Sequence, residues 1–147
     1  MNRSISGAVL AATAIAFSGI LPAPVAAAPK VRNQITYLVK QDFSDCVNSD
    51  VKPAQPAVVG GEAKVTLRDG GKTEVNVRLT KVAPNTTYHL FLKCHYILGD
   101  IKTDSTGRGN NTFSFPSSDS GPVFAFDMYP DGAPAGNKYQ AVQVNLP

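Results

Sequence analysis

Two histidines, His89 and His95, are the side chains best suited to acid–base or metal chemistry near neutral pH. Alternation places both on one face of a predicted strand, six residues apart. At about 3.3 Å per residue they are about 20 Å apart, too far to share one ion unless the strand breaks between them. Neither H-x-H nor H-x-x-x-H spacing occurs, so we predict no metal site and no cofactor.

Other candidates for chemistry are weaker. The stretch from Asp42 to Asp50 gathers carboxylate and amide oxygens, but it lacks the D-x-D-x-D-G order of a calcium loop. There is no G-x-S-x-G elbow, and no pair of carboxylates stands out for glycoside hydrolysis. A Ser/His/Asp triad stays open, since such triads assemble in space. We therefore expect a protein that is not an enzyme.

The first 27 residues have the features of a secretory signal peptide. A positive start at Arg3 precedes an apolar run from Ala8 to Leu21, and small residues end the segment at Ala27. Cleavage there leaves 147 − 27 = 120 residues, enough for one domain over residues 28–147. We expect the mature chain to be secreted, extracellular, without a membrane anchor, and monomeric.

Cys46 and Cys94 are the only two cysteines, and the predicted secretion bears on how they are interpreted. In an oxidising compartment such a pair normally forms a disulfide, and this one would close a loop of 94 − 46 = 48 positions. The chain-entropy estimate of its stabilisation is about 4 kcal/mol. A thiol nucleophile or a metal ligand is the alternative, without a C-x-x-C spacing to support it.

Charge argues against one class of partner. The mature chain has 13 basic and 11 acidic residues, because only Arg3 is lost with the signal peptide. A net charge of +2 is too small to indicate nucleic-acid binding, which usually needs a dense basic stripe.

Alternation with period two predicts strands along the mature chain. Glu62–Arg68 and Thr73–Thr80 form the clearest pair, and the turn Asp69–Lys72 between them predicts a hairpin. The next predicted strand is Tyr88–Tyr96, with Tyr88 facing inward. Further strands are expected at Gln34–Lys40, Gly99–Thr103, Asn111–Phe115, Val123–Tyr129 and Tyr139–Leu146. Eight short strands predict an all-β, antiparallel sandwich or barrel.

The segment Leu79–Tyr88 resembles the tyrosine corner of immunoglobulin-like and fibronectin type III domains, with Pro84 in the turn and Tyr88 after it. The Tyr88 hydroxyl would then bond a backbone group a few residues upstream. An ordinary strand-opening tyrosine is the alternative. The stretch from Val75 to Phe115 also looks like the middle of secreted actinobacterial sandwiches of the neocarzinostatin type, including a T-D-x-x-G hairpin at Thr103–Gly107. That family has two cysteine pairs where this chain has one. The resemblance implies an immunoglobulin-like β-sandwich of about seven or eight strands, and no binding residues.

One predicted surface suggests a function. Outward positions carry aromatic and basic side chains that could bind an anionic or flat ligand, and the candidate binding face is His89, Phe91, Lys93 and His95. A plain solvated sheet face is the alternative. Lys64, Arg68, Arg78 and Lys102 are also basic and outward, although the crossover at Pro84 is expected to put the first three on a different sheet.

We expect a secreted, non-enzymatic module that binds a small ligand or an extracellular protein, through that face or through the loops Gln41–Asp50 and Pro116–Pro122. The alternatives are a small metal, redox or hydrolytic enzyme using His89 or His95, or a proteinaceous inhibitor of an extracellular hydrolase.

Overall fold

The computed structural model describes residues 32–41, 56–132 and 138–146, and strands form most of them. Residues 1–27 and Cys46 lie outside these ranges, so the signal peptide and the disulfide remain predictions. The strands are β1 (Arg32–Lys40), β2 (Val59–Arg68), β3 (Lys72–Leu79), β4 (Thr87–Leu92), β5 (Tyr96–Lys102), β6 (Gly109–Pro116), β7 (Val123–Phe124), β8 (Phe126–Pro130), β9 (Tyr139–Ala141) and β10 (Val144–Asn145). A single 3₁₀ turn, Ser117–Asp119, follows β6.

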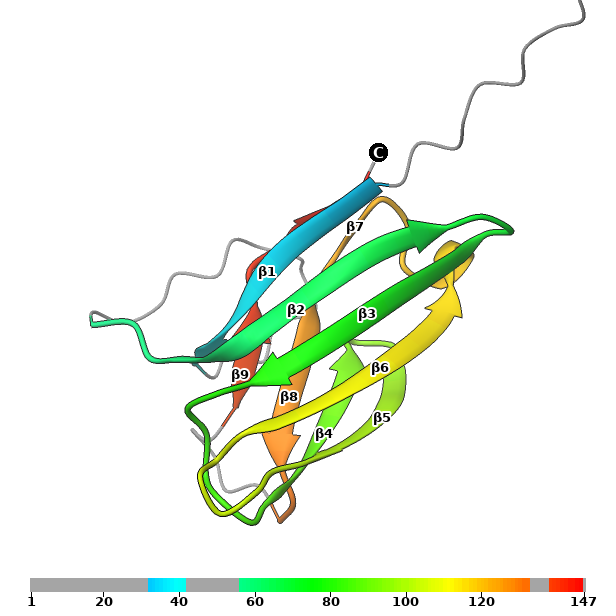
Figure 1. Ribbon diagram of the computed structural model, residues 1–147. Helices are drawn as coiled ribbons and strands as arrows, with labels where there is room; N and C mark the ends of the chain where they lie inside the picture. The colour runs from blue at the N-terminus through cyan, green and yellow to red at the C-terminus, as the bar shows by residue number, and fades with distance from the viewer. Residues whose placement is uncertain (1–31, 42–55, 133–137, 147) are drawn as a thin grey trace, which may run out of the picture.

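Within the described residues the strands form an eight-stranded antiparallel sheet, in the order β5-β4-β8-β9-β1-β2-β3-β6, and a two-stranded sheet of β7 and β10. The prediction of an all-β antiparallel fold is therefore confirmed. Figure 1 shows the large sheet in two layers, with β1, β2, β3 and β6 in front and β9, β8, β4 and β5 behind. The layers join where β9 pairs with the end of β1, at Leu38–Lys40.

The hairpin of β2 and β3 is confirmed, with Arg68 paired to Lys72 across its turn. Gly70 and Gly71 both adopt positive φ there, a conformation that costs glycine little. The inward side chains of β3 are at most 1% exposed, as alternation predicts: Val75, Val77 and Leu79. They face the inward residues of β4 across the core.

The prediction of one strand from Tyr88 to Tyr96 is wrong. Strand β4 ends at Leu92, residues 93–95 form a turn, and β5 begins at Tyr96. The His95 N–H donates to the Leu92 carbonyl at 2.9 Å, and Cys94 takes the left-handed conformation with φ of 61°. The turn contains no Gly, Asn or Asp, the residues that usually mark a turn in a sequence. The alternation of inward and outward residues therefore continued through it without a break.

Two other predicted strands are each divided. Val123–Tyr129 becomes β7 and β8, separated at Ala125, and Tyr139–Leu146 becomes β9 and β10. Phe124 pairs with Val144 while Asp127 pairs with Gln140, so the pairing shifts by one residue between the two hairpin parts. No helix among the described residues is long and apolar enough to cross a membrane.

Candidate functional site

His89 lies on the outward side of β4 between two carboxylates. Its Nδ1 is 2.7 Å from Oδ1 of Asp100 on β5, and its Nε2 is 3.5 Å from Oδ1 of Asp131. The hydrogen bond with Asp100 is the main reason that the pKa of His89 is raised above 6.5. Both ring nitrogens face acids, whereas a general base needs one nitrogen turned toward a nucleophile or substrate. This geometry makes His89 a pH-sensitive structural group.

The remaining members of the predicted face do not join His89 in one open patch. Phe91 is half-buried and packs edge-on against Tyr129 of β8, with ring centroids 5.6 Å apart. Lys93 was expected to point outward from a strand, but it lies in the turn after β4 and is only 6% exposed. His95 is exposed in the same turn. The register assigned to Lys93 and His95 was wrong because the strand ends before them.

The same side of β8 and β9 contains a buried ion pair. Lys138 Nζ lies 3.0 Å from Oδ2 of Asp127, and the two side chains are 5% and 7% exposed. Gln140 donates to the other carboxylate oxygen at 3.0 Å, and the ammonium stands 5.1 Å from the ring centre of Tyr129. Burial alone lowers the pKa of Lys138, but hydrogen bonds to Tyr129 and Asp127 outweigh it and raise that pKa above 10.5. This surface is packed at its centre and leaves little room for a ligand.

No three His, Cys, Asp or Glu side chains within the described ranges are grouped so that they could hold a metal. Cys94 is exposed, and none of the described cysteines is free. Most of the predicted binding loop 41–50 lies outside the described residues. The loop Pro116–Pro122 is held in place by Ser117, whose hydroxyl is 2.9 Å from that of Thr73, and it lines a hollow of about 180 Å³.

Tyr88 makes the upstream backbone hydrogen bond that was expected of it, and Pro84 lies in the turn before β4. Tyr88 is 2% exposed, and its hydroxyl accepts a hydrogen bond from the Ala83 N–H at 2.9 Å. Thr103, the residue after β5, holds the same segment in place. Its hydroxyl donates to the Ala83 carbonyl at 2.8 Å and accepts from the Thr86 N–H at 2.9 Å. The corner fixes where the chain passes from the front layer to the back layer (Figure 1).

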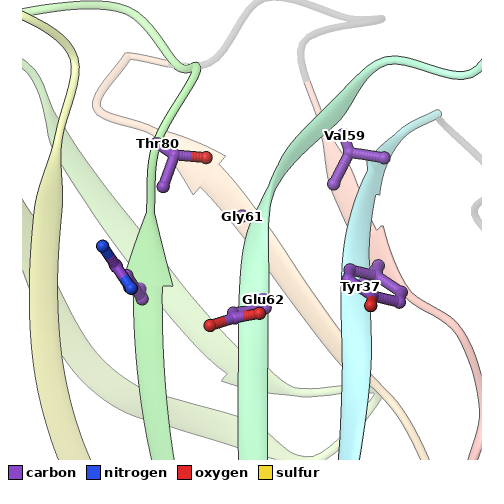
Figure 2. Close-up of a pocket in the computed structure, with 6 residues that line it drawn as sticks. Tyr37, Val59, Gly61, Glu62 and Thr80 are labelled. Atoms are coloured by element: carbon purple, nitrogen blue, oxygen red, sulfur yellow. The ribbon is translucent and has the colours of Figure 1, made fainter.

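The outer face of β1, β2 and β3 offers accessible functional groups. A hollow of about 290 Å³ opens there, lined by Tyr37, Val59, Gly61, Glu62, Arg78 and Thr80. Figure 2 shows Tyr37 on β1, Glu62 on β2 and Thr80 just after the end of β3, arranged around Gly61. Tyr37 is 53% exposed, which leaves its ring open to stacking.

The side chains of this row are unpaired, unlike those of the rows beside it. Tyr37, Glu62 and Arg78 are register partners across β1, β2 and β3. Nearby on the same face, Arg68 forms an ion pair with Glu74, and Asn76 donates to Thr112 at 2.8 Å. No hydrogen bond or ion pair with a described residue engages the three side chains of the Tyr37 row. Their polar groups are therefore available to a ligand.

Two glycines shape the hollow. Leu38 pairs with Gly61 and Val39 with Val59, so Gly60 is an extra residue in a β-bulge. A Cβ on Gly61 would overlap the carbonyl oxygen of Arg78, so only glycine lets β2 and β3 approach this closely. The hollow therefore lies over β1, β2 and β3, each of which has a neighbouring strand on both sides, next to the bulge in β2.

The basic residues of the front layer do not extend the Phe91 face. Lys64, Arg68 and Arg78 lie on β2 and β3, in the layer opposite β4 (Figure 1). Lys102 ends β5 in the back layer. The crossover at Pro84 was expected to put the first three of these residues on a different sheet from Phe91; they belong to the same eight-stranded sheet but lie in its other layer.

Sequence reasoning missed Tyr37 because it shares a face of its strand with the apolar Ile35, while the opposite face carries the polar Gln34 and Thr36. Ile35 and Tyr37 are each 53% exposed, while Thr36 and Leu38 point inward. The signal that could have found Tyr37 is register: once β1 pairs with β2, Tyr37 must share a face with Glu62 and Arg78.

Comparison with known proteins adds no assignment: no protein-family model, curated protein or solved structure matches this chain.

Proposed function

We propose that this chain is a secreted, non-enzymatic binding module, built on an immunoglobulin-like β-sandwich and stapled by a Cys46–Cys94 disulfide. Its binding site is the hollow on β1, β2 and β3, and its ligand is a small polar molecule. The two facing layers, the corner at Tyr88 and the absence of a free cysteine among the described residues support this architecture.

The observation that carries the proposal is the set of unengaged groups around one rigid hollow. Tyr37 presents an aromatic face and a hydroxyl, Glu62 a carboxylate, and Arg78 five N–H donors. A ligand that replaces water at these groups gains hydrogen bonds without breaking any bond inside the described protein. Because the strands are already fixed, little conformational entropy is lost on binding.

The chemistry of the hollow favours binding over catalysis. Glycoside hydrolysis needs two carboxylates about 5 to 9.5 Å apart, and Glu62 is the one carboxylate among the described lining residues. Thr80 is the one aliphatic hydroxyl there, and no histidine lines the hollow to activate it. His89, the best acid–base group by residue type, is engaged by Asp100 and Asp131.

The test is a chemical-shift titration of ¹⁵N-labelled mature protein, residues 28–147, with a panel of monosaccharides, amino acids and nucleotides. We expect saturable shifts centred on Gly61 and its neighbours for at least one compound. Tyr37→Ala and Arg78→Ala should abolish them, while Lys64→Ala, on the same face of β2, should not. Saturable shifts confined to residues 89–95, or turnover of a compound that His89→Ala abolishes, would overturn the proposal.

A further inference from the structure

A second hollow adjoins the first. It measures about 240 Å³ and is lined by Arg78, Leu79, Thr80, Asp104, Arg108, Gly109 and Asn110. Arg78 and Thr80 line both hollows, so the two hollows meet at these residues. The first hollow provides the aromatic ring, and the second provides a second guanidinium and an amide.

Strand register places the two hollows along one line. Tyr37 pairs with Glu62, Glu62 with Arg78, and Arg78 with Asn110 on β6, so the four side chains share the outer face in a single row. Three strand spacings of about 4.8 Å make this row about 14 Å long. It runs across the strands and is long enough for several linked units of a chain-like ligand.

The charge of the row is uneven. Arg78 and Arg108 line the second hollow together with Asp104. The Asp104 carboxylate accepts hydrogen bonds from Thr106 and from the Arg108 backbone, and these lower its pKa, so it stays ionised. Two cations against one anion leave this end net positive, and guanidinium groups bind carboxylates well.

We propose that the two hollows form one continuous groove that binds a linear acidic oligosaccharide, with an acidic unit at Arg78 and Arg108. This inference rests on the proposed function and names its ligand class. Tyr37 stacks on the apolar face of a sugar ring, Glu62 and Asn110 bond sugar hydroxyls, and the two arginines bind the carboxylate.

An extended peptide fits this groove less well. Peptides commonly bind by adding a strand to a free sheet edge. Here β2 and β3 are paired on both sides, and the groove runs across them to the edge strand β6, which carries Asn110. A peptide added to that edge would lie along β6 and not along the groove. The groove offers flat polar contacts in open hollows, which suit hydroxyl-rich rings.

The experiment is isothermal titration of mature protein with trigalacturonic acid, with its fully methyl-esterified form and with galacturonic acid. The ester keeps the same chain and removes the negative charges. We expect trigalacturonic acid to bind about tenfold or more tightly than either comparison ligand, since charge-assisted hydrogen bonds are lost or the groove is only partly filled. Arg108→Ala should remove the preference for the acid over the ester, and Tyr37→Ala should weaken both trisaccharides. Lys64→Ala should change neither.

Equal affinity for acid and ester, an Arg108→Ala variant with unchanged preference, or no binding of any of the three sugars would overturn this inference. If another small compound still gives shifts at the Tyr37 hollow that Tyr37→Ala abolishes, only the oligosaccharide assignment fails. If no compound gives such shifts, the proposed function fails with it.

Discussion

The buried pair of Asp127 and Lys138 allows the sharpest test of the packed face. At 3.0 Å and an effective dielectric of about 20, their gross attraction is about 5.5 kcal/mol. Desolvation of both charges offsets much of this attraction. Removing one partner, however, leaves the other charge unpaired and almost wholly shielded from water, which typically costs about 3 to 5 kcal/mol.

We therefore expect Asp127→Asn and Lys138→Met each to lower the free energy of unfolding by about 3 kcal/mol or more. Lys138→Met should be the more damaging, because the Asp127 carboxylate then keeps only the Gln140 amide among its described partners. In Asp127→Asn the ammonium keeps its contact with the Tyr129 ring. The double variant should cost at least about 2 kcal/mol less than the sum of the two single variants.

Urea unfolding at neutral pH, followed by circular dichroism, measures all four proteins. The pKa of Lys138 is raised above 10.5, so the stability from the pair is fully present below that pH and is lost as pH rises through the folded value. Additive effects in the double variant, or single variants within about 0.5 kcal/mol of wild type, would refute the reasoning. The double variant keeps the test decisive if a single variant does not fold.

Three further outcomes are expected. Tyr88→Phe should cost about 1 kcal/mol in urea unfolding, because Ala83 is an exposed residue and water can partly replace the acceptor that its N–H loses; a loss above about 3 kcal/mol would contradict this. Because Asp100 raises the pKa of His89, the stability from that contact should be fully present below pH 6.5 and fall as pH rises through the folded value. Thermal unfolding measured across this pH range should show a midpoint that falls with pH in wild type and not in His89→Asn. An equal pH dependence of the two midpoints would disprove this prediction. The secreted protein should begin at Ala28 and contain no titratable thiol. N-terminal sequencing and thiol titration check these two points. An intact signal peptide or two reactive thiols would contradict the prediction of a secreted protein with a disulfide.

The sequence predicted the parts of the fold in which the turn residues and the alternation of buried and exposed positions indicate the same structure. The β2–β3 hairpin has alternation on both strands and two glycines in its turn. The turn at residues 93–95 contains no glycine or asparagine, although Cys94 takes the left-handed conformation that these residues usually mark. A pattern with period two cannot detect such a turn when alternation resumes beyond it.

The two faces of the large sheet were harder to predict than its strands. Alternation says which side chains share a face, but not whether that face is covered. Asp127 and Lys138 are charged but buried, whereas Ile35 and Tyr37 are largely apolar but exposed. Both situations arise from contacts between segments far apart in the chain, which a single sequence window does not contain.

The difference between these two faces is itself an argument about where binding occurs. On the back layer, two groups that could meet a ligand are already engaged: His89 by two acids, and Lys138 by Asp127. A ligand there would first have to break those contacts, and breaking a buried pair is costly. On the front layer, Tyr37, Glu62 and Arg78 stand on strands paired at both edges, with no internal bond to break. Binding energy gained there is not spent on rearranging the fold, so the front hollow is the surface on which a ligand gains most.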